Sequence, residues 1–434
     1  MVSMSLPRER SSPVTRRFVT SLTFQGLGIL IASAVIPLCV ALVVQGQLPN
    51  RLSILWNSEI ASLLSAVTAL LIFRKVTSYP GTNDFAYIIP AFSVTYGIAV
   101  VVLLGLRLSY SGAMLSAGYV ATIIFSFIAT QLTQRFGRHH FYVVPFGQTQ
   151  IVEDAPAYEW IVLSEPTLPE GDRHGAIVAD LRCDLDPEWE RMLAEAAIAG
   201  RPVYHTKQLR ESLTGRVEIE HLSENSFGSL LPNLAYRKIK RGSDILFTLL
   251  ALPLVALPML LVAVLIRFDS PGPVLFRQVR MGHRARPFHV YKFRTMTHRE
   301  IAHDGDEARN DAITMAEDHR ITRLGRFLRR SRMDELPQLF NVLRGEMSLI
   351  GPRPEAIPLS QWYESELPFY SYRHIVRPGI TGWAQVNQGH VAELHEAHLK
   401  LHYDFYYIKH FSAWLDTLIA FRTIGVILNG FGSK

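Results

Sequence analysis

The chain has 434 residues, of which 48% are hydrophobic and only 19% are charged, so it is too long for one typical core and a membrane-embedded part is expected. Its 44 Lys and Arg residues against 38 Asp and Glu residues give a modest positive balance, which suits anionic lipid headgroups or a phosphorylated substrate as well as nucleic acid. The two cysteines, Cys39 and Cys183, exclude a disulfide framework and a structural zinc site.

Four apolar segments near the N-terminus are each long enough to span a bilayer at about 1.5 Å per residue. They lie at about residues 25–45, 52–73, 87–106 and 114–132. The first follows an arginine-rich N-terminus but lacks a clear small-residue cleavage site, so it indicates a membrane span rather than a secretory signal. Basic residues gather at the N-terminus and after the second and fourth spans, which predicts that both ends of this bundle, residues 1–139, face the cytoplasm.

The pattern changes at about residue 140. Short apolar segments at residues 141–145, 160–163, 176–179 and 202–204 alternate with a helical pattern at 189–199. This alternation predicts a small, degenerate Rossmann-like α/β domain over residues 140–233. A complete Gly-x-Gly-x-x-Gly turn is missing, since only Gly147 follows the first strand, so a structural or regulatory role is favoured over dinucleotide binding.

Residues 245–266 are apolar over a spanning length but contain Pro253 and Pro258, each of which removes a helical hydrogen bond and bends the axis. Basic residues flank the segment on both sides. They are Arg237, Lys238, Lys240 and Arg241 before it, and Arg267, Arg277, Arg280, Arg284 and Arg286 after it. The positive-inside rule therefore predicts a proline-kinked re-entrant helix at about 245–267 that enters the membrane and returns. The alternative is an ordinary fifth span, which would put all later residues in the periplasm.

Six arginines fall within the thirteen residues from Arg320 to Arg332, several of them three or four apart, so they would share one side of a helix. Such a run is ordinarily a solvated or lipid-facing surface. Here it leads directly to Asp334 and Glu335, which favours a phosphate-binding site, because guanidinium groups pair with phosphoryl oxygens through two hydrogen bonds.

The residues after the arginine run predict a helix with Asp334 as its N-cap, Pro337 in its first turn and Gly345 at its end. The Asp334 carboxylate would then lie on unsatisfied backbone N–H groups. The helix dipole and the nearby arginines would favour its ionised form, which a carboxylate nucleophile needs.

Several ordered motifs between Lys240 and the C-terminus resemble those of one family. They are Lys240-Arg241 with Asp244, Pro271-Gly-Pro-Val-Leu-Phe-Arg-Gln278, Lys292-Phe-Arg-Thr-Met296, Arg320-Ile-Thr-Arg-Leu-Gly-Arg326, Asp334-Glu-Leu-Pro-Gln-Leu-Phe-Asn341, Met347-Ser-Leu-Ile-Gly-Pro-Arg-Pro-Glu355 and Arg377-Pro-Gly-Ile-Thr-Gly-Trp-Ala-Gln385. In these motifs the chain resembles the polyprenyl-phosphate hexose-1-phosphate transferases, also called monotopic phosphoglycosyl transferases or bacterial sugar transferases. Its N-terminal parts resemble those of the long members that prime polysaccharide and O-antigen synthesis.

This resemblance implies an α+β catalytic domain over residues 234–434 and a reaction in two steps. Asp334 would attack the β-phosphate of a UDP-sugar, release UMP and carry the phosphosugar, which undecaprenyl phosphate then accepts. Glu335 would help hold Mg²⁺. Such a route divides one difficult transfer into two, and cations offset the charge of the phosphoryl oxygens.

The same resemblance supplies the candidate substrate-binding residues. They are Arg329, Arg353, Lys292, Arg294 and Gln278. The chain departs from the family pattern at two places: Arg332-Met333 replaces the Ser-Leu before the acidic pair, and Gln388 is inserted after Asn387. Neither departure changes the acidic pair, so the type of reaction is still implied. The identity of the transferred sugar is not.

Aromatic residues are frequent near the C-terminus, and they suit either headgroup depth in a membrane or a buried core. They are Trp362, Tyr363, Phe369, Tyr370, Tyr403, Phe405, Tyr406, Tyr407, Phe411 and Trp414.

The sequence thus predicts a multi-pass protein of the bacterial inner membrane with its catalytic domain on the cytoplasmic face. Glucose and galactose are the first choices of sugar by resemblance, membrane lipids are expected partners, and a homodimer is plausible. Nucleic acid is disfavoured because no stacking platform or known module accompanies the arginines. Two alternatives remain: a non-catalytic scaffold of a polysaccharide assembly complex, and a membrane phosphohydrolase.

Overall fold

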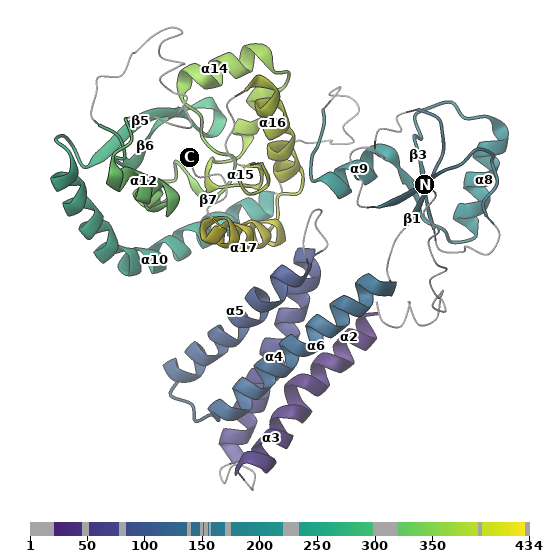
Figure 1. Ribbon diagram of the computed structural model, residues 1–434, viewed down its shortest axis with the longest axis horizontal. Helices are drawn as coiled ribbons and strands as arrows, with labels where there is room; N and C mark the ends of the chain where they lie inside the picture. Colours follow the sequence, from purple (N-terminus) through teal and green to yellow (C-terminus); the bar gives the residue numbers. More distant parts are fainter. Residues whose placement is uncertain are drawn as a thin grey trace, which may run out of the picture. The chain divides into compact units, whose positions relative to one another are not determined.

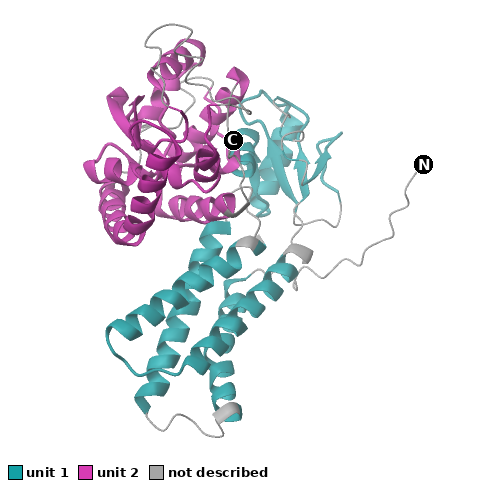
Figure 2. Ribbon diagram, turned by 60° about the vertical axis from the view of Figure 1, so that its left-hand side comes forward, with its two compact units in different colours: residues 1–214 teal, residues 215–434 magenta. Residues whose placement is uncertain are grey.

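A computed structural model describes residues 21–45, 52–77, 84–136, 140–147, 151, 155, 158–169, 175–219, 234–297, 320–388 and 393–429 (Figure 1). The arginine-rich N-terminus lies outside the described residues. The chain divides into two compact units, residues 1–214 and 215–434, which Figure 2 colours separately. The described residues 215–219 therefore belong with the second unit, since Trp383 Nε1 donates to Gly215 O at 2.8 Å and Val217 N donates to His402 O at 3.0 Å.

Each of the four predicted N-terminal spans is helical. The first consists of α2 (Leu22–Leu30), the π-helical turn η1 (Ile31–Val35) and α3 (Ile36–Gln45), and it is followed by α4 (Leu52–Thr77), α5 (Asp84–Gly105) and α6 (Gly112–Phe136). In the described residues five helical segments are long and apolar enough to cross a membrane, the fifth being α10 (Leu234–Asp269). The prediction of a membrane protein is confirmed.

Small and hydroxyl-bearing residues form the inside of this bundle. Ser62 Oγ donates to the Ser33 carbonyl at 2.8 Å and lies 3.1 Å from Tyr96 Oη. A Cβ atom on Gly118 would lie 2.3 Å from Ser62 Oγ, so this glycine permits the close approach of α6 and α4. Small residues bring membrane helices together because apolar side chains gain nothing by leaving lipid for one another.

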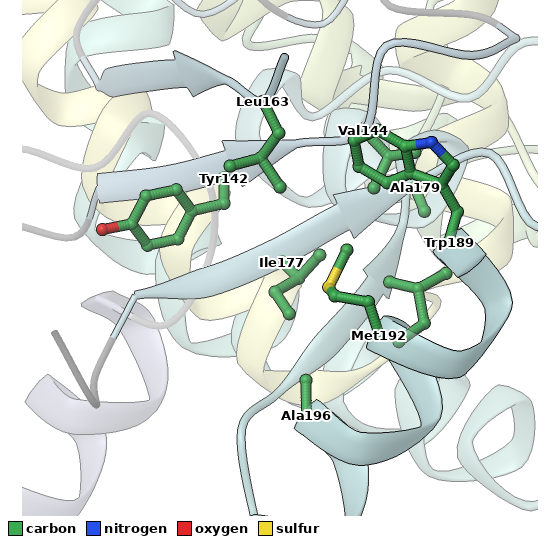
Figure 3. Close-up of a cluster of buried hydrophobic side chains, with 9 residues drawn as sticks. Tyr142, Val144, Leu163, Ile177, Ala179, Trp189, Met192 and Ala196 are labelled. Carbon is green, nitrogen blue, oxygen red and sulfur yellow. The ribbon is translucent and has the colours of Figure 1, made fainter. Parts of the chain in front are cut away.

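The small α/β domain has a four-stranded, all-parallel sheet in the order β2-β1-β3-β4, as the alternating pattern predicts. The strands are β1 (His140–Val143), β2 (Glu159–Val162), β3 (Ala176–Ala179) and β4 (Val203–His205), with helices α8 (Pro187–Ile198) and α9 (Thr206–Thr214). Trp189 and Met192 of α8 pack on Ile177 and Ala179 of β3 (Figure 3). Because both faces are covered, β3 is a continuous apolar run rather than an alternating one.

The second unit begins with α10 and continues with an antiparallel hairpin and a set of short elements. They are β5 (Leu275–Met281), η2 (His283–Ala285), β6 (Pro287–Phe293), α12 (Arg323–Arg330), η3 (Met333–Glu335), α13 (Gln338–Arg344), β7 (Ser348–Ile350), α14 (Ile357–Glu366), η4 (Tyr370–Ile375), β8 (Gly379–Thr381), α15 (Trp383–Asn387), α16 (Leu394–Lys409) and α17 (Ala413–Asn429). Strands β5 and β6 pair along their whole length, and β7 pairs in parallel with β8.

Helix α10 is continuous through Pro253 and Pro258, and Figure 1 shows it bending between its two ends. Its middle is apolar and exposed, with Leu254 78% and Leu257 75% accessible. Both ends are held by the second unit. Near the start Asp244 accepts from Ser348 Oγ at 2.7 Å, and near the end Ile266 packs in one buried cluster with side chains of β6 and α12.

A polar network strengthens the first of these attachments. Lys240 Nζ donates to Asp416 Oδ2 of α17 at 2.6 Å, and Arg241 donates to the Val342 and Leu343 carbonyls at the end of α13. The membrane-type helix is thus bonded to α17 and to the end of α13, the helix that follows the acidic pair.

Most of the C-terminal aromatic residues belong to the core of the second unit rather than to its surface. The buried ones are Tyr363, Tyr370, Tyr403, Phe405, Tyr406, Tyr407 and Phe411. Trp414 is an exception, since 37% of it is exposed. Most of these aromatic residues therefore form a buried core and do not lie at the depth of the lipid headgroups.

Candidate functional site

The acidic pair lies in the short 3-10 turn η3, between α12 and α13. Arg332, just before it, has a left-handed backbone with φ of 58°, a conformation that costs energy for residues other than glycine and turns the chain sharply. Helix α13 begins only at Gln338, and Pro337 occupies its N-cap position. The prediction that Asp334 is the N-cap of this helix is therefore wrong, whereas its predicted end at Gly345, with φ of 84°, is confirmed.

Glu335 forms ion pairs with two cationic side chains, Lys292 and Arg353. Its Oε1 accepts from Lys292 Nζ at 3.0 Å and from Arg353 Nη2 at 3.1 Å, and the residue is 6% exposed. Burial by itself would raise the pKa of Glu335, but Lys292 and Arg353 more than offset this and hold the pKa below its usual range. Burial lowers the pKa of Lys292 to about 8, against the opposing effect of Glu335. Glu335 therefore stays ionised at neutral pH.

Asp334 is in a different environment. It is 8% exposed, and its Oδ1 is buried without a hydrogen-bond partner among the described residues. Burial, followed by repulsion from Glu335, raises the pKa of Asp334 to about 6, while Lys292, Arg353 and Arg329 oppose the rise. The prediction that a helix terminus and the nearby arginines favour the ionised form of Asp334 is wrong in its net effect, because burial and Glu335 raise the pKa more than Lys292, Arg353 and Arg329 lower it. At neutral pH the group is still mostly ionised.

Arg353 lies on a turn, Gly351–Glu355, whose backbone is held from three directions. Arg373 Nη2 donates to Arg353 O at 2.8 Å, Arg280 Nη1 donates to Pro354 O at 2.6 Å, and Met281 N donates to Glu355 O at 2.9 Å. The close approach of Gly351 to Gly379 and Arg377, where a Cβ atom would lie 2.4 Å from Arg377 O, packs the turn against β8. The Arg353 guanidinium is thereby aimed at Glu335.

Gln278 has an indirect role in this arrangement. Its Oε1 accepts from Arg280 Nε at 3.1 Å and Nη2 at 3.0 Å, so it orients the arginine that holds the Pro354 carbonyl. Gln278 therefore acts on the Gly351–Glu355 turn through Arg280.

Arg329 is brought to the pair by helix α12. Its Nε donates to Thr295 Oγ1 at 2.9 Å, and it lies near enough to Asp334 to lower the pKa of that carboxyl. Gly325 makes this possible, because a Cβ atom there would lie 2.0 Å from Thr295 O. One turn of α12 thus packs directly on Thr295, two residues after the end of β6.

Arg294, which was predicted to bind substrate, lies at the end of α10 in the structure. Its Nη2 donates to Ser270 O at 2.6 Å and reaches Ile266 O at 3.5 Å. The side chain therefore satisfies carbonyls at the C-terminal end of α10, where helices leave acceptors unpaired, and it links the membrane-type helix to β6. Among the described residues, no hydrogen bond joins Arg294 to the acidic pair.

Two buried residues of this site were not predicted from the sequence. Arg373 is 3% exposed and, besides Arg353 O, donates to Asp404 Oδ2 and Tyr370 Oη; Asp404 is 1% exposed. A signal for Asp404 exists in the sequence, since a lone carboxylate inside the aromatic run Tyr403-Asp-Phe-Tyr-Tyr407 needs a buried cation. Its partner, 31 residues earlier, carries no such signal.

The comparisons with known proteins agree with this geometry. The bacterial sugar transferase family matches residues 235–430. Over 385 residues, 88% of each chain, the protein is 46% identical to a UDP-N-acetylgalactosamine-undecaprenyl-phosphate N-acetylgalactosaminephosphotransferase of Aeromonas hydrophila. It is also 40% identical to a UDP-glucose:undecaprenyl-phosphate glucose-1-phosphate transferase of Escherichia coli, and 47% identical to one of Xanthomonas campestris. These matches cover 46% and 38% of this chain and 41% and 35% of the relatives. The chain belongs to the bacterial sugar transferase family.

Proposed function

We propose that this protein transfers a sugar 1-phosphate from a UDP-sugar to undecaprenyl phosphate through a covalent phosphosugar on Asp334. One observation supports this most directly: among the described residues, Asp334 Oδ1 is a buried carboxylate oxygen without a hydrogen-bond partner, beside Lys292, Arg329 and Arg353. A buried polar atom without a partner costs free energy unless a ligand uses it. The neighbouring cations suit the phosphoryl oxygens of that ligand.

The proposed first step forms a bond between an Asp334 oxygen and the β-phosphorus of the UDP-sugar, and it breaks the bond to UMP, which leaves with the electron pair. In the second step an oxygen of undecaprenyl phosphate attacks the same phosphorus and releases the Asp334 carboxylate. Arg353 and Lys292 would stabilise the negative charge of the phosphoryl oxygens in both steps. Glu335 would hold these two cations in place rather than react.

Mg²⁺ belongs to this proposal. The described residues contain no group of three or more His, Cys, Asp and Glu side chains placed to bind a metal. A single carboxylate is nevertheless enough for Mg²⁺, which is commonly bound by one or two carboxylates together with substrate phosphates and waters. Glu335 would help hold it, and when bound it would neutralise phosphoryl charge.

The membrane arrangement is proposed as well. Helix α10 has an exposed apolar middle, yet its beginning is bonded to Ser348 and its end is packed on Leu328, both in the second unit. A helix crossing the bilayer would have to separate these two attachments. A re-entrant path with both ends on the cytoplasmic side is therefore favoured, in agreement with the flanking basic residues, and it keeps the catalytic domain on the cytoplasmic face of the inner membrane.

For the donor we propose UDP-N-acetylgalactosamine ahead of UDP-glucose and UDP-galactose. The relative with that name matches 88% of both chains, whereas the two glucose-1-phosphate transferases described above match less than half of this chain. Transfer of this kind would be the first step in the synthesis of an exopolysaccharide, capsule or O-antigen. A homodimer remains a prediction.

The test is a purified-enzyme assay with undecaprenyl phosphate, Mg²⁺ and a panel of UDP-sugars labelled in the sugar. We expect lipid-linked product and free UMP, and we expect Asp334→Asn to abolish both. Rapid quenching without the lipid should leave label on the protein. A non-catalytic scaffold would give no product with any donor, and a phosphohydrolase would release sugar phosphate whether or not undecaprenyl phosphate is present.

A further inference from the structure

The arginine run divides between two faces of α12. At 100° per residue, Arg323, Arg326 and Arg330 fall with Phe327 on an arc of about 100°. Arg329 points the other way, toward Thr295 and the acidic pair. The prediction that the run as a whole lines a phosphate site therefore applies to Arg329 alone among the residues of this helix.

The outward face of α12, defined by Arg323, Arg326, Phe327 and Arg330, has no task in the proposed reaction. All four residues are exposed, and Phe327 is 60% accessible. Within the described residues, the three guanidinium groups have no ion pair or hydrogen bond from their side chains. The outward face therefore presents three cations around one exposed aromatic ring.

The inward face connects this helix to the membrane-type segment. Leu324 and Leu328 of α12 pack in one cluster with Val262 and Ile266, in the last turns of α10. This packing places α12 beside the last turns of α10, the helix whose middle is apolar and exposed.

We propose that the outward face of α12 docks on the anionic phospholipid headgroups of the bilayer that α10 enters. The chemistry fits in two respects: each arginine near an anionic membrane surface contributes about 1 kcal/mol, or roughly fivefold in binding, and a phenylalanine suits the boundary between headgroups and acyl chains. This second contact would limit rocking of the catalytic unit about α10 and hold the acidic pair at the level of the lipid phosphate. The inference rests on the proposed membrane position of α10.

The docking is tested on the full-length protein in lipid nanodiscs of phosphatidylcholine alone or with about one third phosphatidylglycerol, because surface potential is the variable. In a Cys39→Ser/Cys183→Ser background, Phe327→Cys carries a fluorophore and the lipid headgroups carry a spin-label quencher. We expect stronger quenching with phosphatidylglycerol, reduced by salt and by Arg323→Gln/Arg326→Gln. Equal quenching in both lipids would overturn the proposal.

A second labelling site tests the membrane position of α10 separately from the docking of α12. A fluorophore at Leu257→Cys, in the middle of α10, reports on quenchers placed in the acyl chains. Quenching there without quenching at position 327 refutes the docking of α12 and leaves the membrane position of α10 intact. Failure at both positions refutes the membrane position itself.

Activity provides an independent measurement. In phosphatidylglycerol nanodiscs, Arg323→Gln/Arg326→Gln should raise KM for undecaprenyl phosphate several-fold and leave KM for the UDP-sugar unchanged. The control Arg191→Gln/Arg286→Gln removes two exposed arginines elsewhere and should change neither. A rise in KM for the UDP-sugar instead would contradict the proposal, since the arginines would then serve the nucleotide.

Discussion

Asp334 and Glu335 are adjacent in the chain, yet in the described residues Lys292 and Arg353 donate hydrogen bonds to Glu335 and none to Asp334 Oδ1. The Asp334 Oδ1 atom is nevertheless buried. One acid therefore organises the cations and the other is left available for reaction. Such a division of roles between paired carboxylates follows from their environments rather than from their identities.

The first prediction concerns pH. Because the pKa of Asp334 is raised to about 6, the ionised nucleophile is lost as pH falls through that value. The rate of labelled-adduct formation should be flat near pH 7.5 and about tenfold below its plateau at one unit under the pKa. Rapid-quench measurements across pH check this.

The Glu335→Gln variant tests the contribution of Glu335, which is the second cause of the raised pKa of Asp334 after burial. Removing the like charge also frees Lys292 and Arg353 to interact with Asp334, so the acid limb should move to lower pH even though the rate falls. Glu366→Gln, an exposed substitution on α14, is the matched control and should leave the limb in place. An unchanged limb in Glu335→Gln would contradict the coupling between the two carboxylates.

The second prediction concerns Arg373, a positioning residue for Arg353. Replacing Arg373 alone leaves Asp404 buried and unpaired and should cost about 3–5 kcal/mol of stability. The double variant Arg373→Met/Asp404→Leu removes both charges and should recover most of that stability, because buried ion pairs contribute little over apolar packing.

Activity should not recover in the double variant, since the hydrogen bond to Arg353 O is still missing and a displacement of about 1 Å can cost 100-fold in rate. Thermal unfolding and the rate of adduct formation are measured on the same samples. Full activity in the stable double variant would show that Arg373 has only a structural role.

The third prediction concerns the close contact between Gly325 and the backbone of Thr295. Gly325→Ala places a methyl group where Thr295 O now lies 2.0 Å away, so α12 must move off the end of β6. We expect a loss of about 1–3 kcal/mol in the free energy of unfolding and slower adduct formation as Arg329 moves from Thr295. Gly242→Ala, with nothing within 4 Å of its Cβ position, is the control and should be neutral or slightly stabilising.

The fourth prediction concerns the bend of α10. Pro253→Ala/Pro258→Ala restores two backbone donors to the helix and should straighten it, separating its attachments at Ser348 and Leu328. Activity should fall, and a tag at the C-terminus should become accessible from the periplasm in a fraction of molecules. The two single variants show which proline contributes more. Unchanged topology and activity in the double variant would mean that the attachments, not the prolines, set the path.

Local pattern was sufficient to determine much of this protein. The apolar spans, the α/β alternation, the end of α13 at Gly345 and the acidic pair all depend on residues close together in the sequence, where helix period, turn chemistry and composition act directly. The motifs around Asp334 also identified the family.

Only the tertiary structure decided what surrounds those residues. Lys292 reaches Glu335 across 43 residues, Arg373 reaches Asp404 across 31, and Arg294 turns to the end of α10 instead of the acidic pair. The N-cap assigned to Asp334 failed for the same reason: the left-handed turn at Arg332 and the packing of α12 bury the carboxylate before α13 begins. Burial and the distance to charged partners determine the protonation state of a side chain, and neither can be derived from the residues next to it in the sequence.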